Sequence, residues 1–126
     1  QKENFDHFSF SYYSDNHIDA KGGITPAVKA LREKIGHTVK IEVETRTLEE
    51  VKEALSAGAD IIMLDNMDND TMAEAVKIVN KKALLEASGN LTPERLRSVA
   101  LLGVDILSIG ALTHSVTAFD ISMRMA

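Results

Sequence analysis

The feature that most constrains the fold is a series of short apolar runs that recur along the chain. The four runs share a length of seven residues: 38–44, 59–65, 82–88 and 104–110. Continuous apolarity of this length is typical of strands that helices cover on both faces. Because the runs begin about twenty residues apart, they predict a βα repeat built on parallel strands.

Amphipathic segments occupy the intervals between these runs and carry helix start and stop signals. Thr-Pro pairs at 25–26 and 92–93 open two of the segments, because proline is tolerated in the first helical turn. Gly36, Gly58 and Gly103 follow the ends of three segments, where glycine commonly stops a helix. The predicted order is βαβαβαβ, with one more helix before it.

Two of the predicted helices have recognisable N-caps. Thr47 and Glu50 form a capping-box pattern at the start of the second helix, in which the two side chains satisfy backbone N–H groups. Asn69 or Asp70 is the expected N-cap of the third helix, over residues 71–82. These signals place each helix a few residues after a predicted strand.

The predicted fold class is α/β: a partial (βα) barrel of about five parallel strands with flanking helices. The 126 residues, 44% of them hydrophobic, suffice for a single domain over 1–126 but are few for a complete barrel. Residues 1–14 are an atypical N-terminal segment, and the sequence leaves open whether they form the second barrel strand or a substitute for it. Since a partial barrel has open sheet edges, we expect a homo-oligomer.

Composition excludes several classes of partner and chemistry. The net charge is -5, with 14 basic residues interspersed among 19 acidic ones, which argues against a nucleic-acid partner. There is no apolar run long enough to span a bilayer, and the first residues are too polar for a secretory signal, so we expect no membrane partner and a cytoplasmic protein. The absence of cysteine removes disulfides, thiolate nucleophiles and zinc-thiolate sites.

Lysine and histidine positions narrow the chemistry further. A Schiff-base aldolase needs a lysine at a strand end that faces the site, but Lys40 enters its strand instead, so that class is disfavoured. The four histidines lack metal-ligand spacing, and His37 is expected in an exposed helix-to-strand turn. His17 and His114 remain the better candidates for a binding site.

Three acids are predicted to close successive strands. Glu44, Asp65 and Glu86 follow one another at intervals of 21 residues. Acids in such places commonly cap the next helix, but three in phase favour a shared site, because active sites form at the carboxyl edge of parallel strands. Carboxylates there can hold Mg²⁺ together with substrate oxygens.

Two small-residue turns follow the later strands. Residues 87–90 read ASGN and residues 109–115 read IGALTHS. Either could be an ordinary turn, since a Ser-Gly or Gly-Ala pair alone is a weak signal. Turns of this kind also cradle phosphate through backbone N–H groups and hydroxyls. Together with the acids, they predict a phosphorylated, metal-bound substrate.

Several longer motifs resemble, in order and spacing, the C-terminal barrel portion of quinolinate phosphoribosyltransferase, also called nicotinate-nucleotide pyrophosphorylase. The resemblance extends over residues 15–126 and rests on the distinctive runs DNHI (15–18), GGI (22–24), KIEVE (40–44), AGADIIMLDNM (57–67), LEASGN (85–90) and GVDILSIGALTHS (103–115). It implies a transferase that converts quinolinate and phosphoribosyl pyrophosphate into nicotinate mononucleotide, pyrophosphate and carbon dioxide with Mg²⁺. It also implies a second, N-terminal domain and a neighbouring subunit that close the site.

The same resemblance assigns roles to individual residues. Glu44 and Asp65 resemble the acids that contact the ribose hydroxyls and the metal-bound phosphoribosyl pyrophosphate, which makes them the implied catalytic and metal-binding residues. The implied substrate-binding residues are His17, Ser88, Gly89, Asn90, Gly110, Ala111 and His114.

The N-terminal residues depart from the family pattern. The family has a lysine directly before the DNH motif and a His-Arg pair several residues earlier, which help bind the quinolinate carboxylates. Here Ser14 precedes Asp15, and residues 1–13 contain no arginine. Because two substrate carboxylates without cationic partners are costly to bury, we expect the isolated chain to be inactive.

Two hypotheses from different classes therefore stay open. The first is the phosphoribosyl-transferring domain of an enzyme of NAD biosynthesis. The second is a non-catalytic, self-associating βα barrel fragment, natural or engineered, that retains a phosphate-binding site. The motifs from Asp15 onward favour the first hypothesis, and residues 1–14 favour the second.

Overall fold

Strand order in the sheet follows chain order. The computed structural model describes residues 7–11, 23–109 and 114–119. Within these residues one sheet runs β1-β2-β3-β4-β5-β6. Its strands are β1 (His7–Ser11), β2 (Lys40–Thr45), β3 (Ile61–Asp65), β4 (Leu84–Ser88), β5 (Ile106–Ile109) and β6 (His114–Thr117). The pairings from β1 to β5 are parallel, which confirms the predicted sheet of about five parallel strands.

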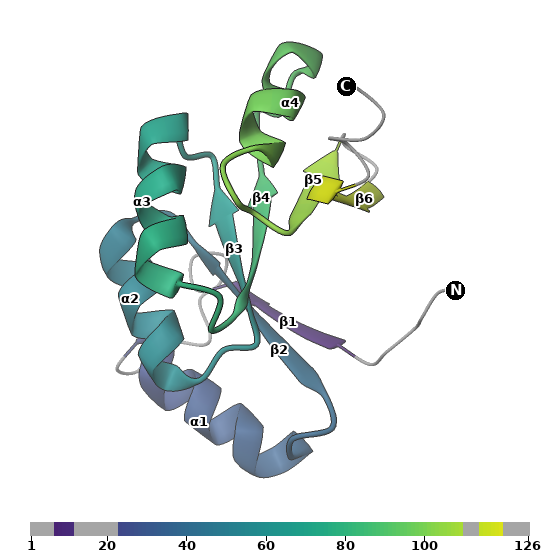
Figure 1. Cartoon of the computed structure of the whole chain (residues 1–126). Helices are drawn as coiled ribbons and strands as arrows, with labels where there is room; N and C mark the ends of the chain where they lie inside the picture. Colours follow the sequence, from purple (N-terminus) through teal and green to yellow (C-terminus); the bar gives the residue numbers. More distant parts are fainter. Residues whose placement is uncertain (1–6, 12–22, 110–113, 120–126) are drawn as a thin grey trace.

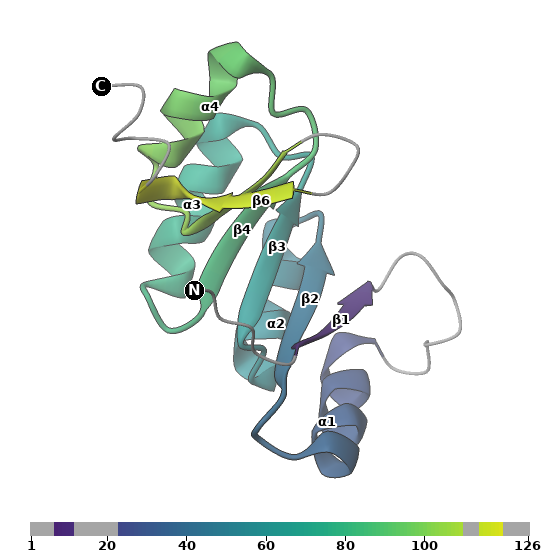
Figure 2. The same cartoon turned by 90° about the vertical axis from the view of Figure 1, so that its right-hand side faces the viewer.

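The helices alternate with the strands as predicted. They are α1 (Ile24–Ile35), α2 (Leu48–Ala57), α3 (Asn69–Val79) and α4 (Pro93–Ala100). Figures 1 and 2 show α1, α2 and α3 side by side along one face of the sheet. In the described part of the chain, no helix is both long enough and apolar enough to cross a membrane.

The main core lies between this helical layer and the sheet. Alternate strand residues that point toward the helices are completely buried, as for Ile41 and Val43 in β2 and Ile62 and Leu64 in β3. Val51 of α2 is equally inaccessible to solvent. Each such side chain contributes about 1.5–3 kcal/mol to folding when it leaves water.

The prediction that helices cover both faces of the strands is wrong for the described residues. Figure 2 looks onto the opposite face of the sheet, which carries no helix there. This face bears polar and charged side chains such as Glu42, Glu44 and Asp65, because successive strand residues point to opposite sides. In a partial barrel it is the face turned toward the barrel axis.

Residues His7–Ser11 of the N-terminal segment form a strand beside β2. Residues His7–Ser11 pair in parallel with β2, from His7 opposite Lys40 to Ser11 opposite Glu44. The sheet therefore begins one strand earlier than the motif-bearing part of the sequence, and β2 is an interior strand.

The structure corrects two predictions about the helix starts. The N-cap of α3 is Asp68, not Asn69 or Asp70: Asp68 has an extended backbone, and its Oδ1 accepts a hydrogen bond of 2.8 Å from the Thr71 N–H. Asn69 is already helical, so it cannot serve as the cap. Also, α1 begins at Ile24, before the Thr-Pro pair, with Pro26 inside its first turn.

The capping box of α2 is confirmed in a shifted form. Thr47 Oγ1 accepts from the Glu50 N–H at 3.1 Å, as the motif predicts. Glu50 Oε1 accepts from the N–H of Arg46, one residue before the cap, at 2.9 Å. Glu50 thus ties the end of β2 to the start of α2.

The last part of the predicted turn over residues 109–115 belongs to a strand, and residues 110–113 lie outside the described part of the chain. His114–Thr117 form β6, which pairs antiparallel with β5 from Ile109 opposite His114 to Ile106 opposite Thr117. This returning strand pairs with the backbone groups along the edge of β5.

Candidate functional site

The predicted acids lie on one face of the sheet near its carboxyl edge, but not at equivalent positions. Glu44 and Glu86 are both level with Met63 of β3, whereas Asp65 is level with Ser88, two residues farther along. The expectation that all three acids close their strands is therefore wrong for Glu86, which lies inside β4.

The reason is a difference in the register of neighbouring strands. The offset between paired residues is 19 from β2 to β3 and 23 from β3 to β4, so an even spacing of 21 residues in sequence does not place the acids in one row. Since side chains two residues apart share a face, Glu44, Asp65 and Glu86 still point to the same side.

Glu42 and Glu86 form a buried pair of carboxyl groups on this face. They are only 4% and 7% exposed. Burial, together with the hydrogen bond and the negative charge of Glu42, raises the pKa of Glu86 to about 9, and a hydrogen bond with Ser108 lowers it in part. At neutral pH the Glu86 carboxyl therefore holds a proton.

Sequence reasoning missed Glu42. The available signal was the alternation in the run KIEVE, where Glu42 lies between the apolar residues Ile41 and Val43 and so points to the other face of the strand. An acid inside a strand is a weak signal, because only the neighbouring strand shows whether its side chain has a partner.

Asp65 is the last residue of β3 and lies at the carboxyl edge of the sheet. Its Oδ2 lies 3.5 Å from Nε of Arg46, in the loop between β2 and α2, and 22% of its side chain is exposed. An exposed ion pair of this kind contributes at most about 1 kcal/mol to stability. It orients the carboxylate while leaving it accessible.

The donor set suits a cation that arrives with its substrate. Among the described residues no group of three or more acidic, histidine or cysteine side chains could enclose a metal ion. Glu44 and Asp65 supply two carboxylates on one face, and Mg²⁺ commonly takes one or two carboxylates and completes its shell with water and phosphate oxygens.

The loop after β4 is held against the loop after β3. The Asn66 N–H donates to the Ser88 carbonyl at 2.8 Å, and Asn90 Nδ2 donates to Asn66 Oδ1 at 2.9 Å. Asn66 and Asn90 have positive φ angles of 61° and 53°, and Gly89 has 88°. This left-handed backbone is costly for most side chains and turns the Ser88–Asn90 peptides sharply at the carboxyl edge.

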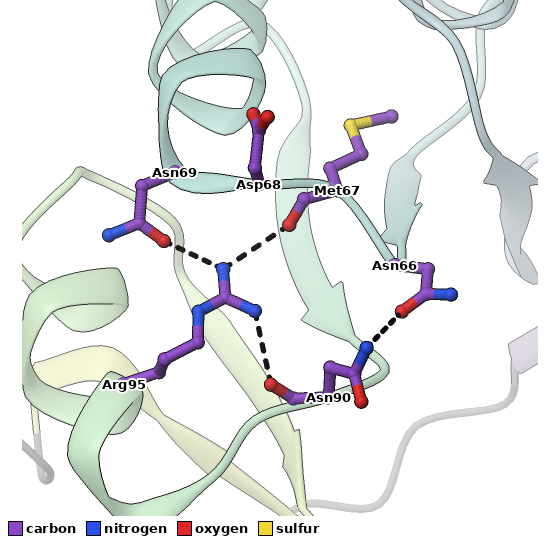
Figure 3. Close-up of a pocket in the computed structure, with 6 residues that line it drawn as sticks. All are labelled: Asn66, Met67, Asp68, Asn69, Asn90 and Arg95. Atoms are coloured by element: carbon purple, nitrogen blue, oxygen red, sulfur yellow. Dashed lines mark hydrogen bonds between the residues drawn. The ribbon is translucent and has the colours of Figure 1, made fainter.

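A cleft of about 370 Å³ opens beside these two loops. Its lining residues are Asn66, Met67, Asp68, Asn69, Asn90 and Arg95. Figure 3 shows the Arg95 side chain reaching between the loops, with hydrogen bonds to Asn90, Met67 and Asn69. Sequence reasoning did not identify Arg95, since an arginine in a helix usually faces solvent.

The structure brings five of the predicted site residues to one region. These are Glu44, Asp65, Ser88, Gly89 and Asn90, which lie at or near the carboxyl ends of β2, β3 and β4.

The remaining predicted site residues cannot be placed in the same way. His17, Gly110 and Ala111 lie outside the described residues. His114 begins β6, opposite Ile109 of β5, and its side chain is likewise outside the described part.

Comparison with known proteins assigns the family. Residues 4–124 match the model of the quinolinate phosphoribosyl transferase C-terminal domain. The chain is 47% identical over 114 residues to a probable nicotinate-nucleotide pyrophosphorylase [carboxylating] of Synechocystis, covering 88% of this chain and 39% of that protein. It is 48% identical over 109 residues to the corresponding Bacillus subtilis protein, covering 86% of this chain and 38% of the relative.

Solved structures agree with this assignment. The nicotinate-nucleotide pyrophosphorylase of Francisella tularensis superposes with a TM-score of 0.75 at 37% identity, covering 90% of this chain and 39% of that structure. The chain thus spans about two-fifths of the length of the relatives that it matches. This chain belongs to the quinolinate phosphoribosyl transferase family and matches its C-terminal domain.

Proposed function

We propose that the chain supplies the phosphoribosyl-binding part of an enzyme that makes nicotinate mononucleotide, pyrophosphate and carbon dioxide from quinolinate and phosphoribosyl pyrophosphate. The observation that carries the proposal is the convergence of Glu44, Asp65 and the Ser88–Asn90 loop at one edge of the sheet. The names of the relatives, nicotinate-nucleotide pyrophosphorylase [carboxylating], support it.

The two accessible carboxylates suit the transition state of this reaction. Cleavage of the bond between the anomeric carbon and pyrophosphate builds positive charge on the ribose, which Glu44 and Asp65 would stabilise from one face. Mg²⁺, when bound to the substrate, would neutralise charge on the departing pyrophosphate. Arg46 would keep Asp65 oriented while the substrate binds.

The Ser88–Asn90 loop suits a phosphate group. Gly89 and Asn90 have left-handed backbone conformations, and turns with such residues can form nests of N–H groups that bind anions. The Ser88 hydroxyl, at the end of β4, adds a further donor. Gly110, Ala111 and His114 remain the predicted second half of the phosphate site, and His17 remains a predicted substrate-binding residue.

The quinolinate clamp is the part of the site that this chain does not supply by itself. Ser14 stands where the family has a lysine, and residues 1–13 lack arginine. We therefore propose that the isolated chain does not synthesise nicotinate mononucleotide. A homo-oligomer and a cytoplasmic location stay predictions.

The alternative function is a non-catalytic fragment that retains the phosphate site. The observation that favours it is again Ser14. The two functions differ in the use of the acids: an enzyme part needs Glu44 and Asp65 for the Mg²⁺ complex of phosphoribosyl pyrophosphate, whereas a phosphate-binding fragment does not.

Titration calorimetry of the chain with phosphoribosyl pyrophosphate and with ribose 5-phosphate, with and without Mg²⁺, tests the proposal. Mg²⁺ should strengthen binding of the pyrophosphate ester more than binding of the monophosphate, because two carboxylates repel a bare anion but attract its metal complex. Glu44→Gln should remove this difference, and Glu33→Gln on exposed α1 should not. Equal effects of Mg²⁺ on both ligands would contradict the enzyme assignment and favour the fragment.

A further inference from the structure

Arg95, in the first turn of α4, connects the loop after β3 to the loop after β4. Its Nη1 donates to the Asn90 carbonyl at 3.0 Å. Its Nη2 donates to the Met67 carbonyl at 3.2 Å and to Asn69 Oδ1 at 2.6 Å. Met67 lies in the loop after β3, Asn69 is the first residue of α3, and Asn90 lies in the loop after β4, more than twenty residues farther along the sequence.

This arginine occupies an unfavourable place in its helix. Arg95 is the third residue of α4, and a positive charge near a helix N-terminus opposes the helix dipole. The fixed donors of the guanidinium group compensate through charge-assisted hydrogen bonds to oxygen acceptors. Their direction is inward, between the two loops, as Figure 3 shows.

The acceptors lie at or next to Asn66 and Asn90, two residues with a left-handed backbone that join the loops by a hydrogen bond. Asn90, with φ 53°, accepts from Arg95 through its own carbonyl, and Met67 directly follows Asn66, with φ 61°. Asn90 Nδ2 in turn donates to Asn66 Oδ1. Arg95, Asn90, Asn66 and Met67 therefore form a closed ring, in which three links are hydrogen bonds and the fourth is the peptide bond from Asn66 to Met67. Loss of the guanidinium group would open this ring.

The ring lies directly beside the candidate site. Asp65 immediately precedes Asn66 and is level with Ser88, and the Asn66 N–H donates to the Ser88 carbonyl. Any change in the separation of the two loops would move the Asp65 carboxylate relative to the backbone N–H groups of residues 88–90.

We infer that Arg95 is a positioning residue that sets the distance between the acid at the end of β3 and the phosphate-binding loop after β4. The inference rests on the proposed function for its catalytic meaning, since the ligand of the loop is a proposal. Arg95 acts through hydrogen-bond geometry, not through its charge on the phosphate, because both Nη1 and Nη2 donate to protein oxygens.

Arg95→Lys separates these two roles. Lysine keeps the positive charge but lacks the planar fork that reaches three acceptors at once. If Arg95 positions the loops, Arg95→Lys and Arg95→Gln should both weaken binding of inorganic phosphate by about tenfold or more. Arg97→Gln, an exposed arginine on the same helix, should bind phosphate like the parent. Arg95→Lys with parental affinity would overturn the inference and leave only a charge effect.

Asn69→Ala provides a milder variant if the Arg95 variants unfold. It removes one of the three acceptors and also the hydrogen bond from Asn69 Nδ2 to Ser98 Oγ. We expect a loss of phosphate affinity of about two- to threefold, smaller than for Arg95→Gln. An unchanged affinity in Asn69→Ala, in a chain that melts like the parent, would count against the ring.

An NMR comparison without ligand distinguishes failure of this inference from failure of the proposed function. In Arg95→Lys the amide signals of Asn66 and of residues 88–90 should shift and exchange hydrogen faster than in the parent, whether or not phosphate binds. If the parent binds no phosphate but these amides respond, the positioning role stands and the phosphate assignment is wrong. If the amides do not respond, Arg95 does not position the loops.

Discussion

Gly89 lies so close to Asn66 that a Cβ atom at position 89 would be 3.0 Å from the Asn66 backbone nitrogen. The glycine is therefore required twice, for this close approach and for its φ of 88°. The contact joins the loop that follows the catalytic candidate Asp65 to the loop proposed to hold phosphate. It is the backbone counterpart of the side-chain ring around Arg95.

Gly89→Ala should destabilise the chain and weaken phosphate binding. The left-handed backbone costs about 1–2 kcal/mol for a residue with a Cβ, and the clash with Asn66 adds about 1–3 kcal/mol. Gly58→Ala is the matched control, since Gly58 has φ 93° but nothing within 4 Å of the added atom. Urea unfolding should show a smaller decrease in the free energy of unfolding for Gly58→Ala than for Gly89→Ala. Equal decreases would mean that the loops after β3 and β4 can move apart without cost.

Glu86→Gln should stabilise the chain at alkaline pH. Because the pKa of Glu86 rises from 4.5 to about 9 on folding, its contribution to stability is complete below pH 4.5 and is lost as the pH rises through about 9. Glutamine stays neutral, so the variant should lose less stability than the parent between pH 4.5 and 9 and be the more stable of the two at pH 9. Denaturant midpoints measured from pH 4 to 9 would test this.

The control for that series is Glu33→Gln on the exposed side of α1. It should follow the pH profile of the parent. A Glu86→Gln profile parallel to the parent across the whole range would show that the carboxyl group of Glu86 ionises normally beside Glu42 and Ser108.

Asp60→Asn should destabilise the amino-terminal end of strands β2 and β3, away from the candidate site, without affecting ligand binding. Arg32 Nη2 contacts Asp60 Oδ2 at 2.8 Å, and the Ile41 N–H donates to the same oxygen at 2.9 Å. Although burial raises the pKa of Asp60, the hydrogen bonds from Arg32 and Ile41 and the charges of Arg32 and Lys40 lower it below 3.8 overall.

The stabilisation by Asp60 is therefore present above pH 3.8 and is lost as the pH falls through the lower folded value. Because the side chain is 32% exposed, solvent screening limits the loss in Asp60→Asn to about 0.5–1.5 kcal/mol at pH 7. Thermal melts should show a lower melting temperature for the variant than for the parent at pH 7, and a smaller difference between the two proteins at pH 3. Phosphate titration should give the parental affinity, and a large loss of affinity would mean that the two ends of these strands are coupled.

Leu84→Lys should reduce self-association of the chain. Leu84 is 46% exposed and belongs to the sheet face opposite the helices, whereas its neighbour Leu85 is buried. An exposed apolar side chain on an open sheet face favours pairing with a second copy, and a lysine there opposes it. Sedimentation velocity across a dilution series should show more monomer for Leu84→Lys than for Leu101→Lys, which changes an exposed leucine after α4. A parent that is monomeric at every concentration would contradict the oligomer prediction.

The sequence by itself determined the order of the strands β2 to β5 and of the four helices, and it indicated which candidate site residues share one edge of the sheet. Apolar runs, glycines at helix ends and the Thr47 cap act over a few residues, so they can be interpreted without knowing the fold. Glu44, Asp65 and Ser88 to Asn90 could be assigned to one edge because parallel strands present their carboxyl ends together. The family motifs within residues 15–126 pointed to the same residues.

The tertiary structure alone decided how neighbouring elements align. The register places Glu44 level with Glu86 and moves Asp65 two residues farther, because it depends on how the intervening helix and loops pack, which no local pattern encodes. The same alignment creates the Glu42–Glu86 carboxyl pair and brings Arg95 to the carbonyls of Met67 and Asn90. Glu42 and Glu86, like Arg95 and Met67, are distant in sequence, so these contacts exist only once the strands are paired.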